Sequence, residues 1–172
     1  MPRVSFDTLP DNGRLWIFPA SRTLSEAESA ALLEAVDVFL DGWAAHGVPL
    51  QCARELRDAQ FLVIGVDEEV EAPSGCSIDA LVNSLRALGS ELGVGLIEHG
   101  PVWFRAQEGV QTVSRAEFRS LASDGAVDAS TPVFDTTLTR VSLFRAGGLE
   151  QPAAKAWHGK AFFGASSSPA TG

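Results

Sequence analysis

The order of hydrophobic patterns along residues 14–105 limits the fold of this chain most strongly. Short apolar or alternating runs typical of strands occupy 14–18, 50–56, 61–66 and 102–105, and apolar residues recur at helical spacing over 24–43 and 78–92. This β-α-β-β-α-β order is that of the ferredoxin-like split β-α-β arrangement. We therefore predict an α+β protein with a ferredoxin-like core over about residues 14–105, in which one face of the sheet carries both helices.

Local signals mark the ends of these elements. Thr23 or Ser25 is the predicted N-cap of the first helix, and Gly47 with Pro49 is expected to end it. Gly93 is expected to end the second helix. The run 61–66 is almost wholly apolar, which is typical of a central, covered strand.

A C-terminal extension of a hairpin and a helix is expected to follow the core. The runs 102–105 and 110–113 flank a turn and predict a hairpin, and Ser114 with Glu117 has the capping-box pattern of a short helix through Leu121. Residues 131–137 have the pattern of a further strand or of an extended segment, and Pro132 would place such a strand at a sheet edge. A weaker strand signal follows at 140–145.

Size, charge and cysteine content restrict the classes of function. With 172 residues, the chain is long enough for one domain, predicted over residues 1–164 and followed by a disordered tail at 165–172. A net charge of −9 disfavours nucleic-acid and anionic-membrane partners, because phosphate binding depends on Lys and Arg. No segment has the length and hydropathy of a membrane span or the core of an export signal, so we expect a cytoplasmic protein with two reduced thiols.

The predicted topology brings the ends of four helices and strands to one edge of the sheet. Successive elements of a split β-α-β fold run in opposite directions, so residues separated in sequence meet where the chain turns. The segments concerned are 43–47, 50–52, 67–69 and 74–79. They hold Cys52, Cys76, His46 and several carboxylates, which predicts a functional site at this edge.

Cys76 is the candidate nucleophile of this site. It lies in the turn that opens the second helix, where free N–H groups and the helix dipole favour an anionic thiolate. His46 is the candidate base or ion-pair partner, and Asp79 or Asp67 is the candidate residue to orient its imidazole. The structural alternative makes Cys76 a small buried residue at a helix–sheet contact, capped by one of the neighbouring serines.

The same turn is a candidate binding site in its own right. Ser74, Gly75 and Ser77 could hold an anion or a partner's carboxylate through backbone N–H groups, and Trp43 completes the candidate ligand-binding set. Cys52 and Cys76 could also form a reversible disulfide. Cys52, Cys76 and His46 are residue types that bind metals, but their spacing is not diagnostic, so no metal site is predicted. No cofactor is identified, and the partner is an unknown small molecule or protein, with a homodimer as a further alternative.

A Trp-His pair follows a loop-rich stretch near the C-terminus. Trp157 and His158 could contact a ligand or partner if exposed, and the favoured interpretation is that they fold back onto the core as an aromatic plug.

Several strings resemble those of a family of uncharacterised bacterial proteins, found widely in Bacteroidetes-type genomes and often labelled "ABC transporter ATPase". The strings are LPDNGRLWI (9–17), WAAHG (43–47), VDE (66–68), SGCSID (74–79) and WH (157–158). The resemblance spans most of the chain and implies a shared fold and a shared site. It does not imply ATP hydrolysis, because the chain has no G-x-x-x-x-G-K-[ST] loop to cradle phosphates.

Overall fold

Three of the expected strands form one antiparallel sheet in the computed structural model, which describes residues 3–164. These strands are β1 (Arg14–Pro19), β4 (Cys52–Arg57) and β5 (Phe61–Val66). Their order is β1-β5-β4, so β5 is the central strand and Ile64 lies opposite both Trp16 and Arg54. Every residue of β5 is buried, which confirms the central position indicated by its apolar run.

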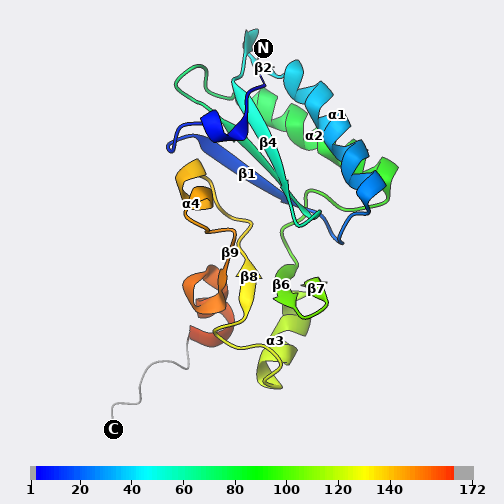
Figure 1. Ribbon diagram of the computed structural model, residues 1–172, viewed down its shortest axis with the longest axis vertical. Helices are drawn as coiled ribbons and strands as arrows, with labels where there is room; N and C mark the ends of the chain where they lie inside the picture. The colour runs from blue at the N-terminus through cyan, green and yellow to red at the C-terminus, as the bar shows by residue number, and fades with distance from the viewer. Residues whose placement is uncertain (1–2, 165–172) are drawn as a thin grey trace. The chain divides into compact units, whose positions relative to one another are not determined.

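Two helices cover one face of this sheet (Figure 1). Helix α1 (Glu26–Asp41) is capped by Ser25, whose side chain accepts the N–H of Glu28 while the Glu28 carboxylate accepts the N–H of Ser25. Helix α2 (Gly75–Leu92) ends at Gly93, which has a left-handed backbone with φ of 68°. The leucine stripes of both helices are buried against the sheet, as their spacing predicted: Leu32, Val36, Leu40, Leu81 and Leu85.

The first helix is shorter than predicted. It ends at Asp41, and the following residues form a two-strand hairpin, β2 (Ala44–Ala45) and β3 (Val48–Pro49). The two turn residues, His46 and Gly47, have φ of 51° and 78°. A two-residue turn with two positive φ angles matches the twist of its strands, so Gly47 serves a hairpin and does not end a helix.

The opposite face of the sheet is covered by two short segments, residues 6–8 and 141–145 (Figure 1). The 3₁₀ turn η1 (Phe6–Thr8) and helix α4 (Val141–Arg145) meet through Phe6 and Phe144, whose ring centroids are 5.4 Å apart. Because α4 is helical, the weak strand prediction for residues 140–145 was wrong.

Residues between 102 and 152 form a second, four-stranded sheet. Its order is β7 (Gly109–Val113), β6 (Val102–Ala106), β8 (Pro132–Phe134) and β9 (Glu150–Pro152), all antiparallel. Helix α3 (Arg115–Ser123) begins at its predicted cap, and the Ser114 side chain accepts the N–H of Glu117. The chain continues into the 3₁₀ turn η2 (Ala153–Lys155) and the π-helix η3 (Gly159–Gly164).

The predicted sheet was therefore wrong at its fourth strand. In a ferredoxin-like sheet this strand would lie beside β1, but β6 pairs with β7 on one side and β8 on the other. The N–H of Leu15 in β1 instead bonds to the carbonyl of Thr139 at 3.0 Å. Pro132 is also not on an edge strand, because β8 lies between β6 and β9, and it is tolerated there as the first residue of the strand.

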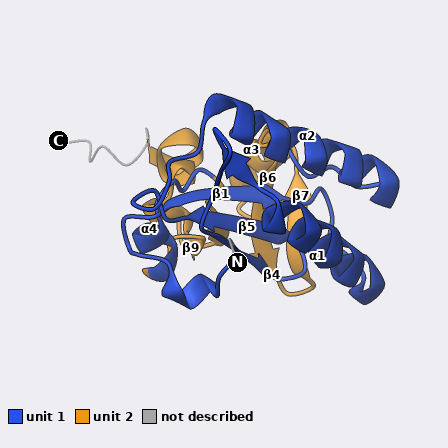
Figure 2. Cartoon of the chain, turned by 90° about the horizontal axis from the view of Figure 1, so that it is seen from above, with its two compact units in different colours: residues 1–98, 137–145 blue, residues 99–136, 146–172 orange. Residues whose placement is uncertain are grey.

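The chain divides into two compact units (Figure 2). Unit 1 comprises residues 1–98 and 137–145, and unit 2 comprises residues 99–136 and 146–172. The α+β class is confirmed. The single domain over residues 1–164 stays a prediction, and the predicted disordered tail at 165–172 lies outside the described residues.

Candidate functional site

In unit 1, hydrogen bonds link the ends of the helices and strands that the predicted topology places at one edge of the sheet. The indole Nε1 of Trp43 donates to the carbonyl oxygen of Ser77 at 2.8 Å, which links the end of the α1 region to the start of α2. The N–H of Leu50 bonds to the carbonyl of Trp43 at 3.0 Å. The N–H of Asp67 bonds to the carbonyl of Gln51 at 3.0 Å. Trp43 is only 3% exposed, so it lies in the core and offers a ligand no free ring face.

The start of α2 is held by a reciprocal cap. The Ser74 hydroxyl accepts the N–H of Ser77 at 3.1 Å, and the Ser77 hydroxyl accepts the N–H of Ser74 at 2.7 Å. Both serine side chains therefore stabilise the helix terminus. Gly75 and Cys76, the first two residues of the helix, are both exposed.

The two cysteines occupy opposite environments. Cys76 is exposed, so the alternative in which it is a buried contact residue was wrong. Cys52 is fully buried, and its thiol points to the carbonyl of Leu40 at 3.7 Å. Burial disfavours the thiolate and, with the nearby Asp41 carboxylate, raises the pKa of Cys52 to about 12. Both thiols are free, and only Cys76 is accessible to a reagent or partner.

The other predicted catalytic residues make no polar contact with this thiol in the part of the chain that the structure describes. His46 is exposed in the β2–β3 turn, and Asp79 is exposed on α2. Asp67 is half-buried, and its carboxylate accepts the N–H of Glu69 at 3.0 Å. Within residues 3–164, no hydrogen bond or ion pair joins any of these three side chains to Cys76, so their catalytic roles stay predictions.

In the part of the chain that the structure describes, no group of three or more His, Cys, Asp and Glu side chains could hold a metal ion. Cys52, Cys76 and His46, the set considered from the sequence, thus do not form such a group.

A polar groove that the sequence did not predict lies along the outer strand β4. Its volume is about 620 Å³, and it is lined by residues 3–7, Leu33 and residues 54–56. Arg54 donates two hydrogen bonds to Asp37 of α1, at 2.8 and 2.9 Å, which hold the pKa of Asp37 below its ordinary value. An arginine between Cys52 and Leu56, at an alternating position that shares their side of the strand, was the available sequence signal.

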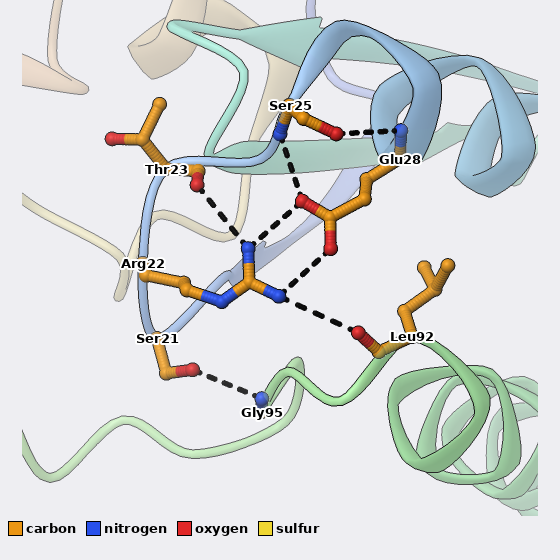
Figure 3. Close-up of polar contacts among 7 residues, drawn as sticks. All are labelled: Ser21, Arg22, Thr23, Ser25, Glu28, Leu92 and Gly95. Atoms are coloured by element: carbon orange, nitrogen blue, oxygen red, sulfur yellow. Dashed lines mark hydrogen bonds and ion pairs between the residues drawn. The ribbon is translucent and has the colours of Figure 1, made fainter.

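A second polar cluster joins the start of α1 to the end of α2 (Figure 3). Arg22 donates two hydrogen bonds of 2.8 Å to Glu28 and a longer one of 3.4 Å to the carbonyl of Leu92. The hydroxyl of Ser21 accepts the N–H of Gly95 at 3.0 Å. The Arg22 side chain, followed by the N–H of the capping serine, lowers the pKa of Glu28 to about 2. The helices are thereby tied together at this end.

In unit 2, the Trp-His pair folds back as an aromatic plug. The rings of Trp157 and His158 are stacked with centroids 3.9 Å apart, and His158 is fully buried. The ring of Phe118 in α3 lies 6.3 Å from that of His158, in an edge-on arrangement.

No protein-family model, curated protein or solved structure matches this chain. The fold and the site define an α+β protein with one accessible thiol at a helix N-terminus, and the family resemblance stays a prediction. Among the described residues, no helix combines the length and apolar character needed to cross a bilayer.

Proposed function

We propose that this protein acts through Cys76 as an accessible thiol nucleophile. The contrast between the two cysteines carries this proposal. Cys76 is exposed at the second residue of an 18-residue helix, whereas Cys52 is buried with a pKa raised to about 12. The helix dipole stabilises a thiolate at this end, and a thiolate is the form that attacks disulfides and electrophilic carbon.

The local geometry supports anion stabilisation at this thiol. The cap uses the N–H groups of Ser74 and Ser77, and the N–H of Ile78 bonds back to the Ser74 carbonyl. The N–H groups of Gly75 and Cys76 remain at the exposed end of the helix. A side chain added at Gly75 would meet nothing within 4 Å, so a reacting group can approach from this side.

The proposal also assigns roles to the other predicted catalytic residues, His46, Asp79 and Asp67. His46 would accept the thiol proton or pair with the thiolate, and Asp79 or Asp67 would orient its imidazole. The bond from Trp43 to Ser77 supports this arrangement, because it holds the segment that leads into the His46 turn against the start of α2. These roles require the imidazole to lie within hydrogen-bond distance of the sulfur, directly or through one water.

The second candidate function is non-catalytic binding at the same turn. The reciprocal cap and the two remaining N–H groups also suit an anion or a partner's carboxylate, and this role needs no sulfur chemistry. An unknown small molecule or protein would be the partner in either case.

For the fold, we propose that unit 1 is a three-stranded relative of the ferredoxin-like arrangement. Its order β1-β5-β4, antiparallel throughout, is the order that the first three strands of such a sheet adopt. Part of the position beside β1 is taken by residues 139–140.

Thiol reactivity of the folded protein tests the leading proposal. Alkylation rates at pH 7 are measured on the wild type, Cys52→Ala and Cys76→Ala, with a short peptide of residues 72–80 as the unfolded reference. We expect one fast-reacting thiol, lost only in Cys76→Ala, that reacts faster than the thiol of the peptide. A rate equal to or below that of the peptide would contradict activation by the helix.

Two probes separate nucleophilic from binding roles. Oxidised glutathione should form a mixed disulfide at Cys76: the thiolate attacks one sulfur, the S–S bond breaks, and one glutathione thiolate leaves. Mass spectrometry detects the adduct, with Cys76→Ser as the control. Saturable shifts of the Gly75 and Cys76 amide signals with inorganic phosphate, retained in Cys76→Ser without adduct formation in the wild type, would favour the binding role.

A further inference from the structure

His158 is a buried imidazole whose two ring nitrogens have no hydrogen-bond partner. A neutral imidazole has one N–H donor and one acceptor, and leaving both unsatisfied away from water costs free energy. Its surroundings are mainly aromatic: the rings of Trp157, Phe118 and Phe162 lie 3.9, 6.3 and 6.5 Å away. A phenylalanine ring would suit this position without that cost, so the histidine weakens the packing in which it takes part.

The backbone that carries His158 is also unusual. Residues 157–158 form a helical turn, and Gly159–Gly164 continues as a π-helix. π-helical turns are rare and are frequently found at functional sites. Gly159 lies against η2 so closely that an added Cβ would be 2.8 Å from the carbonyl oxygen of Ala153. This glycine is closely packed at the start of the π-helix.

The segment covers one face of α3 through ring contacts. The ring of Phe118, which is fully buried, lies 4.8 Å from that of Phe162. The guanidinium of Arg115 lies 4.8 Å from the ring of Trp157, and that of Arg119 lies 5.3 Å from the ring of Phe162. Such contacts are individually modest and lack the directional strength of a bidentate ion pair.

We propose that residues 157–164 form a releasable cover over the Phe118 face of α3, and that mild acid releases this cover by protonating His158. The combination of a buried unpartnered imidazole, a π-helical backbone and ring contacts to α3 supports a segment that detaches before the rest of the unit unfolds. Its release would expose Phe118 and the aromatic side chains of the segment itself.

Burial and the charged groups near His158 determine the direction in which its pKa is shifted. Burial is the main cause that lowers the pKa of His158 to about 4; Asp135 opposes this shift, and Arg115 of α3 adds to it. The same helix also carries Arg119, whose guanidinium lies over the ring of Phe162, and the segment itself carries Lys160. Protonating the imidazole in place would add a positive charge without a hydrogen-bond acceptor, so the closed segment excludes the proton.

Proton linkage gives the size of the effect. The released imidazole has its ordinary pKa near 6.5, so release takes up a proton between about pH 6.5 and pH 4. The release equilibrium should therefore rise about tenfold for each pH unit lost in this window, and ~300-fold in all. Above pH 6.5 it should not depend on the charge of His158.

Amide hydrogen exchange of the full chain from pH 4 to pH 8 tests the proposal, with rates converted to protection factors. We expect peptides of residues 157–164 to lose protection on acidification while β6, a buried strand of the same unit, keeps its own. His158→Phe should remove this pH dependence and increase protection of the segment. His46→Asn, an exposed histidine replaced by a residue that tolerates positive φ, is the matched control and should behave as the wild type.

Two results would overturn the proposal. One is a segment whose protection does not change between pH 7 and pH 4 or changes equally in His158→Phe. The other is loss of protection in the segment and β6 together, which indicates acid unfolding of the whole unit. If His158→Phe does not fold, imidazole NMR of the wild type decides the matter, because the His158 ring must titrate together with the loss of protection.

Discussion

Replacing Trp43 with phenylalanine tests the contact that joins the predicted edge of unit 1. The substitution removes the 2.8 Å bond from the indole nitrogen to the Ser77 carbonyl, a contact worth about 1 kcal/mol net. The smaller ring also leaves space in a site where the native side chain is 3% exposed, which costs about 2 kcal/mol more. We expect the free energy of unfolding to fall by about 3 kcal/mol.

Urea denaturation followed by circular dichroism measures this loss, and hydrogen exchange locates it. Trp16→Phe is the matched control, because Trp16 is a half-buried neighbour whose ring packs edge-on to Trp43 at 6.0 Å. The control should lose about 1 kcal/mol, in proportion to its smaller burial. Exchange should quicken in the first turn of α2 for Trp43→Phe alone. Equal losses in the two variants, without faster exchange at Ser77, would refute the proposed link.

Two further predictions concern charge and packing in unit 1. Arg22→Ala should raise the pKa of Glu28 from about 2 towards 4.5, and carboxyl NMR titration measures this change. In the wild type, the stabilising effect of the Glu28 charge should be complete above about pH 4.5 and should be lost as the pH falls towards 2. An unchanged titration would contradict the pairing. Gly65→Ala places a Cβ 2.5 Å from a Leu9 methyl and should cost about 1–3 kcal/mol in urea denaturation, whereas Gly75→Ala, with nothing within 4 Å, should stay within about 0.5 kcal/mol. A cost for Gly65→Ala no larger than that of the control would contradict this close approach.

Helix starts were the most accurately predicted features, because capping is local chemistry. Ser25 and Ser114 cap α1 and α3 as their sequence patterns indicated. The turn before Cys76 opens α2, and Gly93 closes it. A cap depends on residues within one turn of the helix, so neighbouring sequence is sufficient to identify it.

The hairpin after α1 shows where local reasoning failed. A glycine after a helical pattern commonly ends a helix, but the same glycine with positive φ suits a two-residue hairpin turn. The burial of Trp43 and its bond to Ser77 favour the second outcome, and both depend on α2, more than thirty residues further along the chain. His46 consequently lies in an exposed turn instead of at a helix terminus.

The sequence by itself determined the α+β class, the central position of β5 and the placement of a thiol at a helix start, since each follows from short-range pattern and composition. Only the tertiary structure decided that β6 pairs in the second sheet, because an apolar strand can satisfy its backbone hydrogen bonds in either sheet. The tertiary structure likewise decided that Cys76 is exposed and that Cys52 and His158 are buried. Burial depends on which distant side chains cover a residue, and that covering alone separates an accessible thiol from an inert one.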